Sequence, residues 1–426
     1  MSQYPVRTIE DAYDACHPEE PLLPGDPRYV DLITARGDEA LARSVAWRIV
    51  NTRPPRFHRQ LVTGFRGGGK STELRQLEYF LLHNGYLPVY LDVEDGLDLG
   101  DLGYQDLMVA IARAVEETLR GHGVVLNASL LKDADRWLGE RVLPDEQHDG
   151  LRHMLKAEQG NDARVPLFTR LLTVIGGQLR SGGPRRQAIR QTLEQDWGVF
   201  MQVLSALLDD ARQRLQYQHY RDLVVIVDGL EKLRGGDPAA LDLFVRHAGE
   251  LKAPRCHLVY TVPVSLVFDA GLRDAFEAPT VVLPMVDHAS AEGRQALLRV
   301  IKQRLDIDAV FSRREVAERL IAMSGGSLRD LLRLVRIACE GAQRGITAAD
   351  GERAVRTLAR EFDRLLGDED LEALCRVASR RRISGDAGFA RLVRLRLVHE
   401  YQNDERWADL HPLLQQLGRV RARLQE

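Results

Sequence analysis

The chain has 426 residues, of which 44 % are hydrophobic and 28 % are charged, and its formal net charge is −3. This length predicts two to four domains, and the slightly acidic balance does not favour non-specific binding to DNA. No apolar stretch reaches the roughly 18 residues that a membrane-spanning helix needs, and the first residues lack the basic-then-apolar order of a secretory signal. We therefore expect a cytoplasmic protein that does not engage a membrane.

The cysteines are scattered along the chain without any C-x-x-C spacing, at Cys16, Cys256, Cys339 and Cys375. Two of them are followed by histidine, but neither pair has further metal ligands nearby. The pattern predicts buried free thiols rather than a zinc site.

Residues 1–50 predict an N-terminal extension. It starts with prolines at positions 18, 21, 24 and 27 and continues with an amphipathic, Ala- and Arg-rich segment over residues 38–50. That periodicity predicts a helix laid against the core of the domain that follows. We interpret these residues as an extension that precedes a larger core domain over residues 51–289.

Residues 64–71 form a complete G-x-x-x-x-G-K-[ST] phosphate loop. An apolar run over residues 57–63 predicts the strand before it, and apolar residues at helical spacing predict the helix after it, closed by Asn84 and Gly85. The glycines allow positive φ angles and a close approach of the backbone, so that N–H groups surround the phosphates. The expected nucleotide-binding residues of this segment are Gly64, Phe65, Arg66, Gly67, Gly68, Gly69, Lys70, Ser71 and Thr72.

Lys70 would place a positive charge at the β- and γ-phosphates, and the Ser71 hydroxyl would be a ligand of Mg²⁺. The following helix would direct its positive N-terminus at the same phosphates. The sequence therefore predicts that this chain binds a nucleoside triphosphate with magnesium.

An alternation of strands and helices continues through residues 87–94 and 104–119, which predicts a parallel α/β sheet. Residues 121–220 contain helical segments broken by glycines and no convincing strand. We interpret this region as a helical insertion. Its last helix is expected to carry an apolar stripe made of Ile189, Leu193, Trp197, Phe200, Leu204, Leu208 and Leu215.

The apolar run over residues 223–227 predicts a central strand buried on both faces, and it ends at Asp228. A carboxylate at the C-terminal end of such a strand can orient Mg²⁺ through its water shell, because ligands of open α/β sheets collect at that edge. We therefore expect a Walker B strand, with Ser71 and Asp228 as the metal-site residues.

Residues 228–231, Asp-Gly-Leu-Glu, are similar to the D-G-L-D pattern of STAND-type NTPases, switch ATPases related to AAA+ proteins and found in immune and signalling systems. The resemblance implies a second acid at Glu231. Many AAA+ enzymes have a glutamate directly after the Walker B aspartate, whereas this chain has Gly229, so we expect slow hydrolysis. Lys232 also departs from the family, which often has an acid there.

The resemblance to AAA+ proteins implies further site residues. Thr261, at the end of the predicted strand 257–261, stands where a polar sensor reads the γ-phosphate, with an ordinary strand threonine as the alternative. Arg273 stands where an arginine finger completes a neighbour's site, with a solvated surface arginine as the alternative.

Residues 290–360 predict four helices with capping boxes at Ser312, Ser327 and Thr347, and they resemble the helical lid of AAA+ proteins. Residues 325–329, Gly-Gly-Ser-Leu-Arg, resemble the lid's sensor-2 signature. By that resemblance Arg329 would reach the phosphates and couple the nucleotide state to the lid angle.

Residues 361–426 predict helices at 371–380 and 389–395 followed by a hairpin around residues 403–404, which suggests a winged-helix-like domain. The usual third helix is hard to find unless residues 361–366 supply it. A local basic cluster could contact DNA phosphates and consists of Arg376, Arg380, Arg381, Arg382, Arg391, Arg394 and Arg396.

Residues 407–414, by contrast, resemble the STAND motif in which the winged helix folds back and its histidine, here His411, contacts the bound ADP phosphate. Pro412 stands where those proteins usually have aspartate. We rank the autoinhibited switch first and DNA binding second.

Together these features predict an α/β P-loop NTPase of the ASCE/AAA+ class: a three-layer parallel sheet with a helical insertion, a helical lid and a C-terminal winged-helix-like domain. The expected function is that of an ATP- and Mg²⁺-binding switch in a bacterial conflict or signalling system. It would form homo-oligomers and act on a separate effector protein, because typical STAND switches carry an effector and a repeat sensor for which this chain has no room. A DNA-binding initiator- or loader-like ATPase and a non-hydrolysing nucleotide-bound scaffold remain the alternatives.

Overall fold

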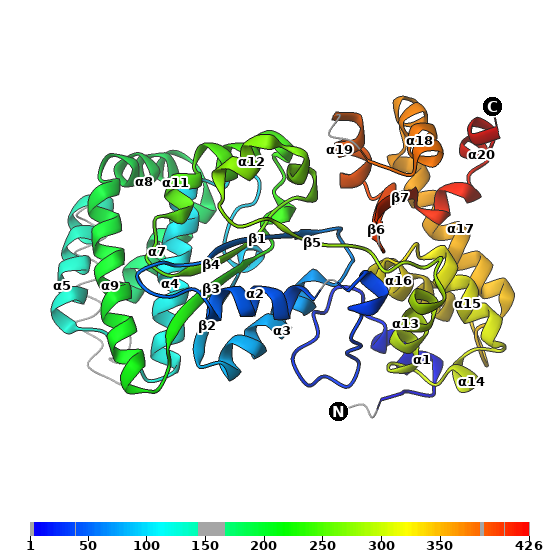
Figure 1. Cartoon of the computed structure of the whole chain (residues 1–426), viewed down its shortest axis with the longest axis horizontal. Helices are drawn as coiled ribbons and strands as arrows, with labels where there is room; N and C mark the ends of the chain where they lie inside the picture. Colours follow the sequence, from blue (N-terminus) through cyan, green and yellow to red (C-terminus); the bar gives the residue numbers. More distant parts are fainter. Residues whose placement is uncertain (1–3, 39, 144–166, 384–386, 404, 426) are drawn as a thin grey trace. The chain divides into compact units, whose positions relative to one another are not determined.

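The computed structural model describes residues 4–38, 40–143, 167–383, 387–403 and 405–425 (Figure 1). The chain divides into two compact units. Unit 1 contains residues 1–44, 63–77 and 281–426, and unit 2 contains residues 45–62 and 78–280. Each unit has its own cluster of buried apolar side chains, so each has a separate hydrophobic core. The division differs from the expected domain boundaries, since residues 63–77 group with the lid and the C-terminal region.

Unit 2 is built on parallel strands in the order β2-β3-β4-β1, with bounds Arg59–Gly64 for β1, Tyr86–Asp92 for β2, Asp222–Asp228 for β3 and His257–Thr261 for β4. Every residue of β3 and β4 is buried, as expected from their continuous apolar sequences. The last two residues of β1 belong to unit 1, where they lie beside β5 (Val281–Leu283). The expected parallel α/β sheet is confirmed.

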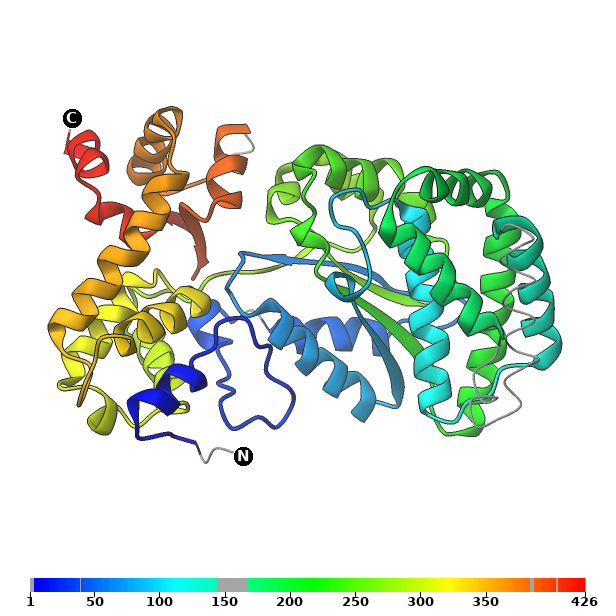
Figure 2. The same ribbon diagram turned by 180° about the vertical axis from the view of Figure 1, so that it is seen from behind.

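Helices surround these strands (Figure 2), and α4 (Tyr104–Gly121) packs against β2. The described part of the expected insertion is helical, with α5 (Ala128–Trp137), η3 (Leu138–Val142), α7 (Leu167–Ser181), α8 (Pro184–Gln195) and α9 (Trp197–Tyr217). One expectation is wrong: the apolar stripe from Ile189 to Leu215 lies on two helices instead of one. The backbone leaves helical geometry at Asp196 (φ −102°, ψ 23°), which ends α8 and precedes α9.

The rest of unit 2 follows β3 and β4 in short elements. After β3 come η4 (Leu230–Lys232), α10 (Gly236–Leu241), η5 (Asp242–Arg246) and α11 (Ala248–Lys252). After β4 come η6 (Val264–Phe268) and α12 (Ala270–Ala275). Apolar residues of these elements, such as Phe244 and Leu272, are buried in the same core as the strands.

The N-terminal extension packs on the lid region within unit 1. Val6 forms a parallel bridge with Leu305, and α1 (Ile9–Ala15) packs against α16 (Leu328–Cys339). The extension continues through η1 (Thr34–Arg36), and α2 (Leu41–Val50) begins in unit 1 and ends in unit 2. The phosphate-loop helix α3 (Lys70–His83) also begins in unit 1, with residues 70–77.

The fully described lid stretch contains five helices where the sequence analysis expected four: α13 (Ala291–Lys302), α14 (Ile307–Val310), α15 (Arg314–Met323), α16 and α17 (Ala348–Leu365). The expected caps of α16 and α17 are confirmed, since Ser327 Oγ and Thr347 Oγ1 each accept a hydrogen bond from the third residue of the helix. The cap expected at Ser312 is wrong, because α15 starts one residue later, after Arg313, with no side-chain cap.

The C-terminal region contains α18 (Asp368–Arg380), α19 (Ala387–Arg394), the antiparallel hairpin of β6 (Val398–Gln402) and β7 (Arg406–Leu410), η7 (Pro412–Gln416) and α20 (Gly418–Gln425). Residues 361–365, considered as a separate helix from the sequence, are the last turns of α17. Cys16, Cys256 and Cys339 are buried free thiols, as expected, whereas Cys375 is partly exposed. None of the described helices is long and apolar enough to cross a membrane.

Candidate nucleotide-binding site

The phosphate loop connects the end of β1 to Lys70, the first residue of α3. Gly67 and Gly69 have φ angles of +91° and +88°, which an L side chain rarely adopts. The sequence analysis expected positive φ angles also at Gly64 and Gly68, and this is wrong for both. Gly64 is needed for another reason, because a Cβ there would lie 2.7 Å from the main-chain oxygen of Leu283.

Main-chain groups of the loop are bound by other segments of unit 1. The Gly67 carbonyl accepts a hydrogen bond from the Arg329 N–H at 3.1 Å, and a Cβ at Gly67 would lie 2.8 Å from Ser327 Oγ. At the start of α3, the Thr72 hydroxyl accepts a hydrogen bond from the Leu22 N–H at 3.2 Å. The lid and the N-terminal extension therefore both contact the phosphate loop directly.

Arg36, which the sequence analysis did not single out, also holds the loop. Its guanidinium donates to the Gly68 carbonyl and lies 3.5 Å from the Glu73 carboxylate. Burial lowers the pKa of Arg36, and burial also raises the pKa of Glu73 against the opposing effect of Arg36. A lone arginine before a glycine in an irregular segment gives no sequence signal, so only the tertiary structure reveals this contact.

Lys70 and Ser71 occupy the first turn of α3, where the helix presents unpaired N–H groups and a partial positive charge. Lys70 is buried, Ser71 is partly exposed, and Arg66 at the tip of the loop is exposed. A lysine and a hydroxyl in these positions are suited to bind the β- and γ-phosphates and a magnesium ion.

Arg329 lies in the first turn of α16, beside the phosphate loop. Its guanidinium forms an ion pair with Glu19 of the N-terminal extension. Burial lowers the pKa of Arg329, and the nearby charge of Arg66 lowers it further. Two arginines thus stand close together at the loop, an arrangement that polyphosphate anions would stabilise.

His411, expected from the family resemblance to contact a nucleotide phosphate, is fully buried beside the lid in unit 1. Its Nδ1 accepts a hydrogen bond from the Leu413 N–H at 3.2 Å, which places the ring proton on Nε2. Nε2 lies 3.5 Å from the carboxylate of Asp330, a fully buried residue in the first turn of α16. Burial alone would raise the pKa of Asp330, but His411 and the charge of Arg396 hold it well below its ordinary value.

A second buried histidine, His399 on β6, was missed by the sequence analysis. Its ring makes an edge contact with Phe65 of the phosphate loop, with the ring centres 5.9 Å apart, and lies 4.9 Å from the ring of His411. Its Nδ1 donates to the Gly325 carbonyl at 3.0 Å, and the Tyr401 hydroxyl donates to the same carbonyl at 2.7 Å. Strand β6 therefore contacts both the phosphate loop and the glycine turn that precedes α16.

In unit 2, Asp228 is buried at the end of β3, and both of its carboxylate oxygens accept hydrogen bonds. Oδ1 accepts from the Gly229 N–H and Oδ2 from the Tyr90 hydroxyl, both at 2.8 Å. Asp92 is the partner of Asp228 in the strand register. Burial raises the pKa of Asp92, and the charge of Asp228 contributes in the same direction. Two neighbouring carboxylates on one edge form a local negative potential suited to a hydrated cation.

Gly229 follows Asp228 with a φ angle of +92°. A Cβ there would lie 3.0 Å from the Val93 side chain and 3.2 Å from Asp92 Oδ1. A side chain at the position directly after Asp228 would therefore be strained in its backbone and tightly packed against Val93 and Asp92, which disfavours a glutamate there.

The other expected residues of unit 2 lie in different surroundings. Thr261 is buried, and its hydroxyl accepts a hydrogen bond from the Leu230 N–H at 3.0 Å, which ties β4 to η4. Glu231 is partly buried in η4, next to Lys232, which forms an ion pair with Glu94. Arg273 is exposed on α12 and makes no ion pair within the described residues.

The strand register places the polar residues of unit 2 on one edge. Val62 of β1 is the partner of Thr261, and Val227 is the partner of Tyr260, so Asp228 follows at the level of Thr261. Two residues beyond Val62 the chain reaches Gly64. The register thus places Asp92, Asp228 and Thr261 at the carboxyl ends of neighbouring strands of unit 2, the edge at which parallel sheets bind their ligands.

The described residues include no cluster of three or more His, Cys, Asp or Glu side chains that could hold a metal by themselves. Proteins usually bind magnesium through one or two side chains together with the phosphates of the nucleotide. In unit 2, the hydrogen-bonded carboxylate of Asp228 is of the kind that suits a hard cation that keeps part of its water shell.

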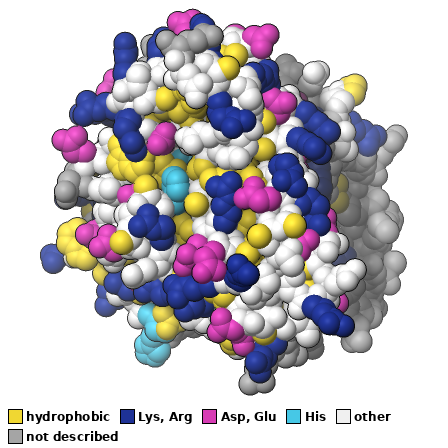
Figure 3. Space-filling model, turned by 90° about the vertical axis from the view of Figure 1, so that its right-hand side faces the viewer, with side chains coloured by type: hydrophobic (Ala, Val, Ile, Leu, Met, Phe, Trp, Pro, Cys, Tyr) yellow, Lys and Arg dark blue, Asp and Glu magenta, His cyan; other side chains and the backbone are white. Residues whose placement is uncertain are grey.

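The expected basic cluster of the C-terminal region is partly neutralised. Arg381, Arg382, Arg391 and Arg396 form ion pairs, and Arg376 lies over the ring of Phe389. Arg380 and Arg394 are exposed and make no ion pair within the described part of the chain. On the face of the molecule in Figure 3, lysine and arginine side chains are interspersed with acidic and apolar ones.

A phosphate loop between β1 and α3, a parallel sheet with a buried aspartate at the end of β3, and a group of helices that follows the sheet define an α/β fold of the P-loop NTPase type. No protein-family model matches the chain, and a search of curated proteins gives no match. Among solved structures the chain is similar to a Walker-type ATPase of Pyrococcus abyssi, with 13 % identity, a TM-score of 0.43, and coverage of 97 % of this chain and 100 % of that chain. It is also similar to the ADP form of the Aeropyrum pernix ORC2 protein, with 14 % identity, a TM-score of 0.46 and 97 % of each chain covered. The corresponding values for Cdc6p of Pyrobaculum aerophilum are 15 %, 0.41 and 97 % of each chain.

Proposed function

We propose that this protein is an ATP-binding, slowly hydrolysing switch in which the bound nucleotide controls whether the C-terminal region stays docked on the phosphate loop and the lid. The observation that carries the proposal is the position of β6. Its His399 contacts Phe65 of the phosphate loop, and its His399 and Tyr401 both bond to Gly325 at the start of the sensor-2 turn. A change in the bound phosphates would therefore affect β6 both through Phe65 and through Gly325.

In this proposal Lys70, Ser71 and Arg329 bind the polyphosphate, and Asp228 orients the water shell of Mg²⁺. The ion would neutralise charge on the β- and γ-phosphates when it is bound. Thr261 would sense the γ-phosphate, because its hydroxyl proton is available for donation while its oxygen accepts from Leu230.

Slow hydrolysis follows from the surroundings of Asp228. Gly229 occupies the position of the glutamate that would activate water, and its left-handed backbone and the nearby Val93 and Asp92 disfavour a side chain there. Glu231, two residues further on, is the remaining acid of the motif and is our candidate for positioning the attacking water. A water-positioning group outside its usual place predicts a small rate.

The differential contact that drives the switch is the γ-phosphate. When ATP replaces ADP, additional negative charge would attract the guanidinium of Arg329 away from Glu19, its present partner. Gly325 lies only four residues before Arg329, so a rotation of the start of α16 would move the carbonyl that holds His399 and Tyr401. The docked and undocked states then differ in affinity for ATP, as a ligand-driven shift of populations requires.

Hydrogen–deuterium exchange tests this proposal. We expect the amides of residues 398–402 to be protected with ADP and to exchange faster with ATP in the wild type. Lys70→Ala should abolish the difference, whereas Lys302→Ala, which changes an exposed lysine of α13, should leave it unchanged. Equal exchange of these amides with ADP, ATP and no nucleotide would contradict the switch.

Assembly through Arg273 extends the proposal, because this exposed arginine is available to complete the site of a neighbouring copy. Size-exclusion chromatography with ATP should show a larger species for the wild type and for Arg185→Ala, a control at another exposed arginine of unit 2. Arg273→Ala should keep ATP binding and reduce ATP turnover in that species. Unchanged turnover in Arg273→Ala would show that Arg273 does not contribute to the site of a neighbouring copy.

DNA binding through the C-terminal region is the second candidate function, favoured by the exposed Arg380 and Arg394, which make no ion pair with any residue that the structure describes. Fluorescence anisotropy with a labelled duplex at 50–200 mM salt would test it. If these two side chains neutralise phosphates, the double variant Arg380→Ala/Arg394→Ala should reduce the slope of log K against log salt by about two. A wild type that does not bind the duplex at low salt rules this function out.

A further inference from the structure

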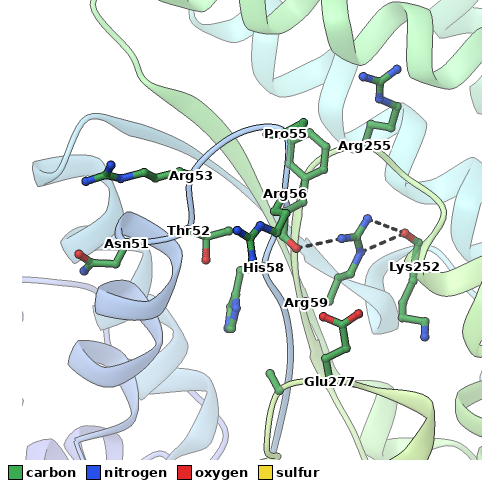
Figure 4. Close-up of a pocket in the computed structure, with 12 residues that line it drawn as sticks. Asn51, Thr52, Arg53, Pro55, Arg56, His58, Arg59, Lys252, Arg255 and Glu277 are labelled. Atoms are coloured by element: carbon green, nitrogen blue, oxygen red, sulfur yellow. Dashed lines mark hydrogen bonds between the residues drawn. The ribbon is translucent and has the colours of Figure 1, made fainter.

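Unit 2 contains a pocket of about 810 Å³ at the beginning of β1, the end of that strand opposite to the phosphate loop (Figure 4). Its walls come from the segment between α2 and β1, from the segment between α11 and β4, and from the chain after α12. The lining residues are Asn51, Thr52, Arg53, Pro55, Arg56, Phe57, His58, Arg59, Lys252, Arg255, Glu277 and Ala278.

The lining is strongly positive, since it contains five lysine or arginine side chains and a single carboxylate, that of Glu277. Among these five cations, Arg255 alone has an acidic partner within the described residues, Asp209 at 3.3 Å. Arg53 and Arg56 are exposed and make no ion pair within the described residues. In a chain whose net charge is −3, this is a local concentration of uncompensated positive charge.

Arg59 is fixed in the wall of the pocket, as Figure 4 shows. Its guanidinium donates to the main-chain carbonyls of Phe57 at 2.9 Å and of Lys252 at 2.9 and 3.0 Å. The Lys252 ammonium donates to the Ala275 carbonyl. These partners are neutral, so they orient the two cations without cancelling their charge. The structure thus holds positive groups in place around a hollow.

The segment that carries Arg53 and Arg56 is anchored at both ends. The Thr52 hydroxyl donates to the Arg48 carbonyl at 2.8 Å, and the His58 N–H donates to Nδ1 of the buried His257 at 3.0 Å. Burial lowers the pKa of His58, so this ring is neutral at pH 7 and leaves the charge of the pocket to the arginines and Lys252.

We propose that this pocket binds a compact ligand that carries several phosphate groups, at a site distinct from the phosphate loop. Guanidinium groups suit phosphate oxygens, and the volume lies in the usual range for small-molecule sites of about 300–1,000 Å³. The cations surround one hollow instead of following an extended groove, which favours a small polyanion over a nucleic-acid strand. The pocket lies at the first residue of β1, whereas the phosphate loop follows the last residue of that strand.

Isothermal titration with myo-inositol hexakisphosphate, at 150 mM salt and with saturating ADP, tests the proposal. We expect one ligand per wild-type chain and an affinity that ADP does not change. The double variant Arg53→Glu/Arg56→Glu should weaken binding at least about tenfold, because charge-assisted hydrogen bonds to phosphate are lost. Arg185→Glu, which reverses the charge of an exposed arginine of α8 that forms no ion pair among the described residues, is the matched control and should bind like the wild type.

Several outcomes would overturn the site: no binding by the wild type, competition by ADP, or equal affinity of the double variant and the wild type. A 16-nucleotide oligothymidylate serves as the competing ligand. If it binds more tightly than the inositol phosphate and the same double variant abolishes this binding, the pocket is a nucleic-acid site and the proposal of a small ligand is wrong. Circular dichroism checks the fold, and Arg53→Gln/Arg56→Gln replaces the charge reversal if that variant does not fold. The proposal does not depend on the nucleotide switch, whose failure would leave this titration unaffected.

Discussion

In unit 1 the groups around the phosphate loop come from segments far apart in the sequence, whereas in unit 2 the groups around Asp228 come from the ends of neighbouring parallel strands. The loop is contacted by Arg36 of the extension, by Arg329 of the lid and, through Phe65, by His399 of the hairpin. Asp228 is bonded by Tyr90 from the adjacent strand and by the next N–H of its own chain.

This difference indicates which of the two units can change its contacts when a ligand binds. Contacts between strands of one sheet are fixed by the hydrogen-bond register, so the acidic edge of unit 2 keeps its geometry. The contacts in unit 1 join elements through a few hydrogen bonds and ring contacts, which a ligand can exchange for its own interactions. Unit 1 is therefore the part in which we expect nucleotide-dependent change.

The largest expected effect lies in the buried pair of unit 1. Asp330→Asn should destabilise unit 1 by about 3 kcal/mol or more, because it removes the buried carboxylate that compensates the charge of Arg396 and lies beside Nε2 of His411. The fluorescence of Trp407, which stacks on Tyr401, should report this loss in urea. Asp363→Asn, which breaks the exposed pair with Arg419, should cost at most about 1 kcal/mol. Equal effects of the two variants would contradict the buried pair as the main contact of the C-terminal region.

The second effect is a loss of nucleotide affinity when the expected contact between Lys70 and the phosphates is removed. Lys70→Ala should weaken ATP and ADP binding by about 100-fold, or ~2.7 kcal/mol, because a charged contact to the phosphates is removed. Isothermal titration with and without Mg²⁺ measures it, with Lys302→Ala as the control. Retained affinity in Lys70→Ala would place the nucleotide elsewhere.

The third effect is a dependence of the free energy of unfolding on pH, which we expect in both units. Burial lowers the pKa of His399 in unit 1 and of His257 in unit 2 to about 3. The unfolded chain takes up a proton on each ring near pH 6.5, and the folded chain does not. Each buried histidine therefore makes its full contribution to the free energy of unfolding above pH 6.5. This contribution is lost as the pH falls towards 3, by about 1.4 kcal/mol per pH unit for each histidine.

Urea unfolding at pH 7 and pH 5 checks this dependence. His399→Asn should reduce it by ~2 kcal/mol in the transition seen by Trp407, and His257→Asn by the same amount in the transition of unit 2. Asparagine can keep one hydrogen bond of each ring, so both variants should fold. A pH dependence that stays the same in both variants would show that other groups cause it.

The smallest effect concerns the acidic edge. Asp228→Asn should weaken ATP binding by about tenfold in the presence of Mg²⁺ and leave it unchanged in EDTA, because the aspartate acts on the cation and not on the phosphates. Titrations under the two conditions measure the difference. The same loss in EDTA would mean that Asp228 contacts the nucleotide directly.

Local sequence patterns predicted the elements that depend on neighbouring residues. The phosphate loop, the strand that ends at Asp228 and the caps at Ser327 and Thr347 were all expected from short stretches, and the structure contains each of them. The errors were local as well: a helix break at Asp196 and an extra helix in the lid do not follow from hydrophobic periodicity alone.

The sequence by itself determined the class of the protein, since a glycine-rich loop, a lysine and a buried strand ending in aspartate need only adjacent residues to be recognised. Only the tertiary structure placed Arg36 on Gly68, Tyr90 on Asp228 and His399 beside Phe65, and only it gathered the basic pocket at the start of β1. The physical reason is distance along the chain. Arg36 and Gly68 are 32 residues apart and Tyr90 and Asp228 are 138 apart, and such contacts arise from packing and strand pairing, which no local pattern encodes.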